Sequence, residues 1–334
     1  MREVLILTAN TGHGHIAAAR TMRDILLERK VECELKDTLS FVGEKTAELI
    51  ANAIVNIAVK TPRAFGFMYQ AADAVSSDER KSPLYYANSL YAEKLYDHII
   101  EHQFDTAICP HLFPAEALSY LKHEKGLDID CYFISTDYTC IPFLEELEMD
   151  GIFIPHRDLR GSFTGRGIAP DHLIISGIPV ADEFLNKIQK DKARTSLNIP
   201  AGKKVFLVMT GGEGGGDALK LTGELTEHGG KDIYVLVMCG RNKDLKDSID
   251  GQFEGDDRVL SVPFTDKISI YMDACDVLLT KPGGISSTEA AVKGIALIHT
   301  FPIPGVETEN ARFFSQHGMS ILAEDEEDAA RNAL

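Results

Sequence analysis

Short apolar runs alternate along the chain with longer segments whose apolar residues recur at helical spacing. The first run, Val4–Leu7, is uniformly apolar, as expected for a strand buried on both faces of a parallel sheet. In the segment that follows, Ile16–Arg29, the residues Ala18, Met22 and Leu26 lie on one helical face. The first half of the chain thereby predicts strands at Val4–Leu7, Val31–Leu35, Thr106–Cys109, Cys131–Ser135, Gly151–Ile154 and His172–Ile175. It also predicts helices at Pro114–His123 and Asp158–Arg166.

A second series of strands follows a junction in which a helix is predicted to run to about Arg194. Its strands are predicted at Val205–Met209, Ile233–Met238, Val259–Pro263, Asp276–Thr280 and Ala296–Thr300. Strands that alternate with helices are typical of doubly wound α/β sheets. We therefore predict two Rossmann-like domains, residues 1–190 and 191–334, that face each other across a cleft.

Two segments depart from this alternation. Residues 41–102 contain no clear strand and predict two or three amphipathic helices with breaks near Pro62 and Pro83. This insertion is rich in Tyr, Phe, Met and Ile and carries basic residues. The chain ends at Leu334, shortly after an Ala-rich helix begins, so we expect the second domain to be truncated at its C-terminus.

Composition narrows the class of protein. With 44% hydrophobic and 25% charged residues the chain is typical of a globular protein, and its formal net charge of −17 argues against a nucleic-acid partner. The N-terminus shows no signal-peptide pattern, and no apolar run approaches the length of a membrane span. The six cysteines form no C-x-x-C pair, which indicates reduced core thiols in a cytoplasmic protein.

The turn Thr280–Glu289 is the strongest candidate for phosphate binding. Pro282, Gly283 and Gly284 lie between a buried strand and a helix, where the helix N-terminus offers unpaired N–H groups. Glu289 lies three residues after Ser286, which is the spacing of a helix capping box. The alternative is that Glu289 accepts hydrogen bonds from two ribose hydroxyls.

Three further motifs have both a functional and a structural interpretation. His13-Gly14-His15 follows the first strand, where a histidine can act as a general base or simply face water in a capping loop. The glycine-rich loop 211–216 can cradle a diphosphate or be a flexible turn, with Asp217 as helix N-cap. In the Pro-rich segment 302–310, Glu307 and Asn310 would share one helix face and clamp sugar hydroxyls, or belong to a solvated helix start.

Taken in chain order, these motifs carry a resemblance. They are His13-Gly14-His15, the loop 211–216, Cys239-Gly240-Arg241-Asn242, Lys281-Pro282-Gly283-Gly284, Glu289 and Pro304-Gly305-x-Glu307-x-x-Asn310-Ala311. From Val4 to about Gly318 the chain resembles the group of monogalactosyldiacylglycerol synthases and processive diacylglycerol glucosyltransferases. This group is part of glycosyltransferase family 28 and has the GT-B fold.

The resemblance implies an inverting transferase that moves a hexose from a UDP-sugar to a lipid acceptor such as diacylglycerol, without a metal or other cofactor in the chemical step. It implies His15 as the catalytic base. It implies a donor site of Gly14, Gly211, Gly212, Gly214, Arg241, Phe264, Gly283, Gly284, Ser286, Glu289, Glu307 and Asn310. It implies an acceptor side of His111, Pro114 and Asp137. The insertion would contact the inner face of the cell membrane peripherally, although helices packed on the domain core explain it equally well.

One residue departs from the group's pattern, because Val306 stands where glutamine is frequent, which leaves the hexose undetermined. Two alternatives stay open at this point. One is an enzyme like the UDP-N-acetylglucosamine 2-epimerases, which share the fold. The other is a nucleotide-sugar-binding protein without turnover.

Overall fold

A computed structural model describes residues 3–43, 45–47, 49, 52–53, 57, 61–77, 80–210 and 217–334. The chain divides into two compact units, residues 1–179 with 304–306, and residues 180–303 with 307–334. The division lies about ten residues before the predicted domain boundary. The short helices α8 (Asp182–Leu185) and α9 (Lys190–Ser196) pack on α13 and α12 of the second unit, which explains the difference.

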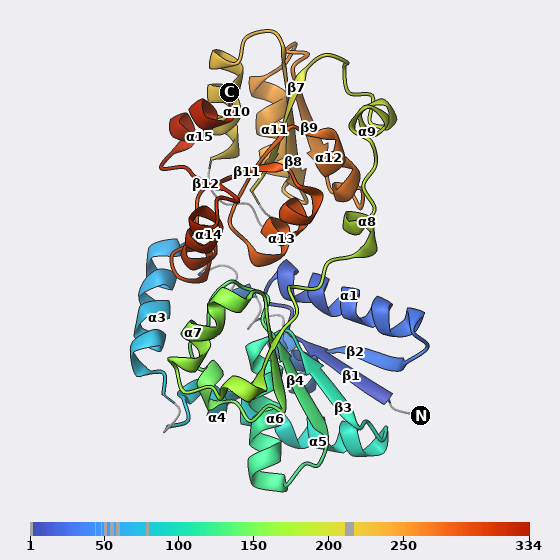
Figure 1. The fold of residues 1–334 in the computed structure, drawn as a ribbon, viewed down its shortest axis with the longest axis vertical. Helices are drawn as coiled ribbons and strands as arrows, with labels where there is room; N and C mark the ends of the chain where they lie inside the picture. Colours follow the sequence, from blue (N-terminus) through green and yellow to red (C-terminus); the bar gives the residue numbers. More distant parts are fainter. Residues whose placement is uncertain are drawn as a thin grey trace. The chain divides into compact units, whose positions relative to one another are not determined.

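The first unit is built on a parallel sheet with the order β2-β1-β3-β4-β5-β6 (Figure 1). Its strands are β1 (Glu3–Thr8), β2 (Glu32–Asp37), β3 (Thr106–Cys109), β4 (Asp130–Ile134), β5 (Gly151–Ile154) and β6 (Leu173–Ile175). Its α-helices are α1 (His13–Glu28), α3 (Pro62–Val75), α4 (Pro83–Ser89), α5 (Ala92–Glu101), α6 (Leu112–Lys125) and α7 (Arg160–Thr164). Short 3₁₀ turns are η1 (Thr38–Val42), η2 (Leu144–Glu146), η3 (Arg157–Leu159) and η4 (Pro170–His172). The predicted strands are confirmed to within one residue at each end, apart from the end of β2, which lies two residues further along the chain.

The apolar run of β1 is buried on both faces, as its uniform composition predicts. Val4 and Ile6 pack with Ala19 and Met22 of α1, while α6 also contacts β1 and β3. Helices therefore cover the sheet on both sides, and the carboxyl ends of β1, β3 and β4 lie at one edge of it.

In the insertion each of the two prolines begins a helix, in agreement with the helix boundaries predicted near them. Pro62 is the first residue of α3 and Pro83 the first of α4, because a helix leaves its first N–H groups unpaired and proline lacks one. The Ser82 hydroxyl caps α4, and the Ser82 N–H donates to the buried carboxylate of Glu146 at 2.5 Å. The predicted helical character of the described part of the insertion is confirmed.

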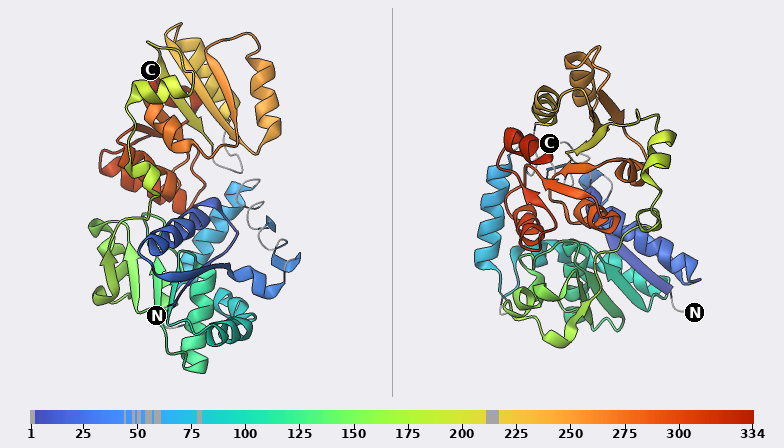
Figure 2. Two further views of the ribbon diagram at one scale, coloured as in Figure 1. Left: turned by 90° about the vertical axis from the view of Figure 1, so that its right-hand side faces the viewer. Right: turned by 45° about the horizontal axis from the view of Figure 1, so that its top comes forward.

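The second unit is also a parallel sheet, with the order β12-β11-β10-β7-β8-β9 (Figures 1 and 2). Its strands are β7 (Lys204–Met209), β8 (Ile233–Gly240), β9 (Val259–Pro263), β10 (Val277–Thr280), β11 (Ala296–His299) and β12 (Ile321–Leu322). Its longer helices are α10 (Ala218–His228), α11 (Lys243–Gln252), α12 (Ile268–Ala274), α13 (Gly284–Lys293), α14 (Val306–Gln316) and α15 (Glu326–Ala333). Asp217 is confirmed as the N-cap of α10, with its carboxylate 2.8 Å from the Lys220 N–H.

Two features of this unit differ from the sequence prediction. The single helix predicted to run to about Arg194 is wrong, since two short helices, α8 and α9, occupy this stretch. The strand β12 was not predicted, because two residues are too few for a periodicity to be visible. Both depend on packing: the chain between α8 and α9 is held by an Ile188 N–H bond to Asp273, and β12 pairs with β11.

Among the residues that the structure describes, no helix has both the length and the apolar composition needed to cross a bilayer.

Candidate functional site

His15 lies in the first turn of α1, at the carboxyl edge of the first sheet. Its Nδ1 is 2.8 Å from the carbonyl oxygen of Pro110, just after β3, and 3.0 Å from the Thr136 hydroxyl, just after β4. A carbonyl oxygen can only accept, so Nδ1 carries the proton and donates it to Pro110. The other ring nitrogen, Nε2, then keeps its lone pair. This is the tautomer that a general base requires.

His111 packs beside His15 and is locked in the opposite tautomer. Its Nδ1 accepts the Phe113 N–H at 3.1 Å, so its Nε2 carries the proton and donates to the Thr11 hydroxyl at 2.7 Å. The two imidazole rings meet edge to face, 4.6 Å between centroids. Burial first, and then His15, lower the pKa of His111 well below its usual range. The ring is therefore neutral and joins the loops after β1 and β3.

The other two predicted acceptor residues, Pro114 and Asp137, come after β3 and β4, respectively. Pro114 is buried in the first turn of α6. Asp137 follows β4, and its carboxylate lies 3.4 Å from the Thr136 hydroxyl. Thr11 and Pro110 were not among the predicted site residues, although both lie within three residues of a strand end, where ligand-binding residues of doubly wound sheets gather.

In the second unit, α13 begins at Gly284, and its N-cap Gly283 has no side chain that could bond the first N–H groups. The alternative interpretation of Ser286 and Glu289 as a capping box is therefore excluded, because both residues lie inside the helix. The glycines at the cap place no side chain in front of these N–H groups, as binding of an anion requires. The assignment of Gly283, Gly284 and Ser286 to phosphate stays a prediction.

Glu289 lies one turn further along α13 and is held in its protonated form. Burial first, and then the neighbouring carboxylate of Glu183, raise the pKa of Glu289 to about 8. A protonated carboxyl both donates and accepts hydrogen bonds, so it can pair with two hydroxyls of a ribose without adding charge beside a diphosphate.

The raised pKa of Glu289 predicts how the stability of the fold changes with pH. A carboxyl whose pKa is higher in the folded than in the unfolded state contributes stability that is complete below its ordinary pKa and is lost as the pH rises through about 8. Glu289→Gln removes this loss. We expect its melting temperature, relative to that of the wild type, to increase between pH 5 and pH 9, as measured by thermal unfolding. A difference that stays constant over this range would contradict the assignment.

Arg241 and Phe264, predicted to border the nucleotide, lie against each other. Gly240 ends β8 in the left-handed conformation, φ +56°, and Arg241 follows it. The guanidinium carbon lies 4.5 Å from the centroid of the Phe264 ring, which is 61% exposed. An exposed ring covered by a guanidinium offers a flat surface for a nucleobase.

Glu307 and Asn310, on the first turns of α14, both reach the turn that precedes α13. The Glu307 carboxylate accepts the Ile303 N–H at 2.7 Å and lies 3.4 Å from Lys281 Nζ. Asn310 is completely buried, and its amide donates to the Pro282 carbonyl at 3.0 Å. Asn310 therefore holds the turn in place. Whether either residue also binds the donor sugar stays a prediction.

A buried histidine ties α13 to the sheet. His299 at the end of β11 lies 2.9 Å from the Ser287 hydroxyl and 3.0 Å from the Ser320 hydroxyl. Burial lowers the pKa of His299 to about 4, so the ring is neutral and bonds to both hydroxyls as donor and acceptor. The sequence analysis missed this residue, which fixes the direction of α13.

The remaining residues of the predicted donor site are glycines. Gly14 lies next to His15 in α1. Gly211, Gly212 and Gly214 lie outside the described residues.

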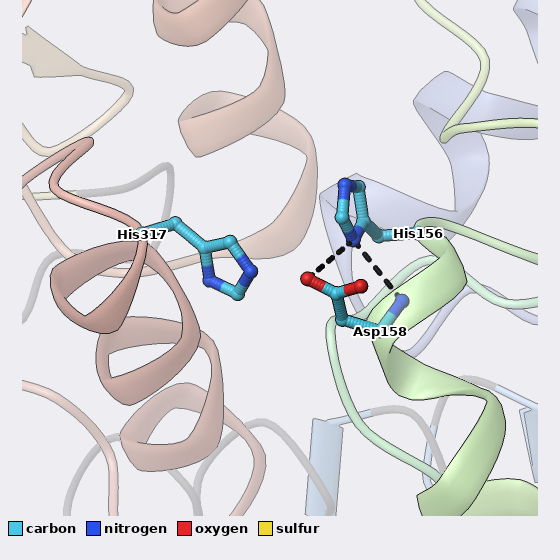
Figure 3. A group of neighbouring side chains, drawn as sticks. All are labelled: His156, Asp158 and His317. Atoms are coloured by element: carbon cyan, nitrogen blue, oxygen red, sulfur yellow. Dashed lines mark hydrogen bonds and ion pairs between the residues drawn. The ribbon is translucent and has the colours of Figure 1, made fainter.

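Figure 3 draws three polar residues of the two units. His156 accepts the Asp158 N–H at 3.2 Å and caps η3 in the first unit, while His317 in the second unit bonds the Phe313 carbonyl at 2.8 Å.

Two family models match the chain. The model described as monogalactosyldiacylglycerol (MGDG) synthase matches residues 15–180, and that of the glycosyltransferase family 28 C-terminal domain matches residues 207–331. A protein of Bacillus subtilis named processive diacylglycerol beta-glucosyltransferase is 28% identical over 335 residues, 98% of this chain and 85% of the relative. A Bacillus pumilus protein of the same name is 28% identical over 98% of this chain and 84% of its own.

Solved structures agree with the fold. MurG of Acinetobacter baumannii has a TM-score of 0.63 and 12% identity, over 99% of this chain and 90% of its own. The UDP-GlcNAc 2-epimerase of Neisseria meningitidis has a TM-score of 0.61 and 13% identity, over 99% and 90%. At such identities the likeness shows the two-domain α/β fold alone, as predicted. Because the two family models follow one another along most of the chain, the protein belongs to glycosyltransferase family 28, in the group of monogalactosyldiacylglycerol synthases and processive diacylglycerol glucosyltransferases.

Proposed function

We propose that this protein is an inverting glycosyltransferase that moves a hexose from a UDP-sugar to a lipid acceptor, diacylglycerol. The observation that supports it best is the similarity over 98% of the chain to processive diacylglycerol beta-glucosyltransferases. The arrangement around His15 agrees with this function, since a base with a free Nε2 is what activation of an acceptor hydroxyl needs.

In the proposed reaction, the hydroxyl oxygen of diacylglycerol attacks the anomeric carbon of the hexose while His15 Nε2 accepts the proton of that hydroxyl. The bond from that carbon to the diphosphate oxygen breaks on the opposite face, and UDP leaves with the electron pair. The configuration at carbon is thereby inverted. The Pro110 carbonyl stabilises the positive charge that develops on the imidazole, because it accepts the Nδ1–H.

No metal is proposed for the chemical step. The developing charge on UDP would be stabilised by the N-terminal N–H groups of α13 and by nearby cations of the protein. We expect excess EDTA to leave the rate of glycolipid formation unchanged within about twofold, since a metal that stabilised the leaving group would contribute several kcal/mol. A loss of activity that Mg²⁺ or Mn²⁺ restores would contradict this.

Contact with the membrane is proposed to involve helix α3. Five of its outward-facing residues form an apolar stripe at helical spacing: Ala64, Phe67, Met68, Ala71 and Val75. Phe67 is 78% and Met68 58% exposed, and Arg63 precedes the stripe. An exposed apolar stripe with a flanking cation is typical of helices that lie in the interface of an anionic bilayer.

We expect Phe67→Glu to weaken binding to vesicles of phosphatidylglycerol and diacylglycerol by about tenfold, because it replaces apolar area that the bilayer would bury with a charge. Cosedimentation measures this effect. Gln70→Glu adds the same charge to an exposed position of α3 outside the stripe, and we expect a much smaller change. Equal binding by Phe67→Glu and the wild type would exclude α3 as the contact.

The function is tested by incubating the folded protein with UDP-glucose, UDP-galactose or UDP-N-acetylglucosamine and diacylglycerol vesicles, with lipid products identified by mass spectrometry. A hexosyldiacylglycerol is expected. Failure to form any glycolipid would refute the proposal. In that case, conversion of UDP-N-acetylglucosamine to its 2-epimer without acceptor would indicate an epimerase. Thermal stabilisation by UDP without any product would indicate a binding protein.

A further inference from the structure

Lys281 and Glu307 form an ion pair at the turn that leads into α13. The Lys281 Nζ lies 3.4 Å from Glu307 Oε1, and the two side chains are only 14% and 18% exposed. The second oxygen of the carboxylate accepts the Ile303 N–H at 2.7 Å, so the carboxylate is fixed by the backbone. A partly buried pair of this kind is screened less by water than a pair on the surface.

Lys281 lies on the turn that leads to the proposed phosphate site at the start of α13. The Gly283 N–H donates to the Lys281 carbonyl at 2.8 Å, which closes a tight turn between Lys281 and the N-cap of α13. The chain as a whole carries a formal net charge of −17, so an anionic donor approaches against the field of the protein. Binding a diphosphate therefore needs local positive charge, and Lys281 is the cation on the turn itself.

Building on the proposed function, we propose that Glu307 competes with the donor's diphosphate for Lys281. UDP draws Lys281 away from Glu307 and leaves that carboxylate without its cation. A UDP-hexose supplies sugar hydroxyls that donate to the carboxylate in place of Lys281. The pair thus favours the intact donor over the product UDP, because only the donor replaces the ion pair that Glu307 loses.

This competition makes the two partners behave in opposite ways. Removing the charge of Lys281 weakens binding of UDP and of UDP-hexose alike. Removing the charge of Glu307 releases Lys281, so UDP binds more tightly, while the preference for UDP-hexose over UDP decreases. A glutamate that served only as a structural support would not improve UDP binding when it is replaced.

The test is calorimetric binding of UDP and of UDP-glucose to the full chain. Lys281→Met is expected to weaken UDP binding about tenfold, as for loss of one charge-assisted hydrogen bond, and Lys281→Arg to retain it within about threefold. Glu307→Gln is expected to tighten UDP binding about threefold or more and to lower the ratio of UDP-glucose to UDP affinity. Glu309→Gln is the matched control, since Glu309 lies on the same turn of α14 but pairs with Arg312.

Weaker or unchanged UDP binding by Glu307→Gln would overturn the inference, provided that the variant melts like the wild type. So would equal tightening by Glu309→Gln, which would indicate a general effect of net charge. The outcome is separable from that of the proposed function, because UDP calorimetry needs no acceptor. Glycolipid formation without the expected UDP pattern overturns the competition alone. The expected pattern without glycolipid overturns the transferase alone, and a wild type that does not bind UDP overturns both.

Discussion

Replacing His15 by alanine is expected to lower kcat by about 10²- to 10⁴-fold, the usual contribution of a general base. The variant removes an imidazole whose Nδ1–H is bonded to the Pro110 carbonyl, an arrangement that leaves Nε2 to accept a proton. Among the described residues of the predicted donor site, all except Gly14 belong to the second unit, including Arg241 and Glu289. We therefore expect the affinity for UDP to change by less than about twofold, which is less than the loss of one hydrogen bond to UDP would cause.

Steady-state rates with diacylglycerol vesicles and UDP calorimetry together measure this prediction. His172→Ala is a suitable control, because His172 is an exposed histidine of the same unit in η4. It should retain the wild-type rate. If His15→Ala lost UDP affinity as strongly as turnover, His15 would be a donor ligand rather than the base. A wild-type rate in His15→Ala would exclude both roles.

Replacing Lys293 by methionine is expected to lower the free energy of unfolding by about 3–5 kcal/mol, the usual cost of leaving one partner of a buried ion pair uncompensated. Lys293 on α13 lies 2.7 Å from Asp273 on α12, and the two side chains are 0% and 4% exposed. The same ammonium group donates to the Glu183 carbonyl at 3.1 Å. One buried charge thus holds together α12, α13 and α8, and through α13 it supports the proposed phosphate turn.

Urea unfolding of the variants measures this effect. Lys293→Met combined with Asp273→Leu should recover part of the lost stability, since no buried charge is then left unpaired. Lys246→Met is the matched control, because Lys246 pairs with Asp250 on the surface of the same unit and the loss of such an exposed pair should destabilise the protein far less. Equal destabilisation by both single variants would contradict the assigned role of Lys293.

The arrangement of strands and helices could be predicted from the sequence because it depends on local composition. Val4–Leu7 is apolar throughout, and a run of that kind is stable only between two layers of helices. The ordered motifs from His13 to Asn310 likewise sufficed for the family and the fold, which the comparisons confirm. The spacing of Ser286 and Glu289 left a capping box open as an alternative, which the sequence could not exclude. The backbone begins the helix at Gly284 instead.

The sequence by itself therefore determined the fold class, the family and the types of residue available for chemistry. Only the tertiary structure decided what those residues can do. The tautomer of His15 depends on a carbonyl 95 positions away along the chain, at Pro110. The raised pKa of Glu289 depends on burial and on Glu183, and the ion pair of Lys281 depends on where α14 begins. Protonation and pairing depend on distance and on exclusion of water, and neither can be deduced from the order of residues.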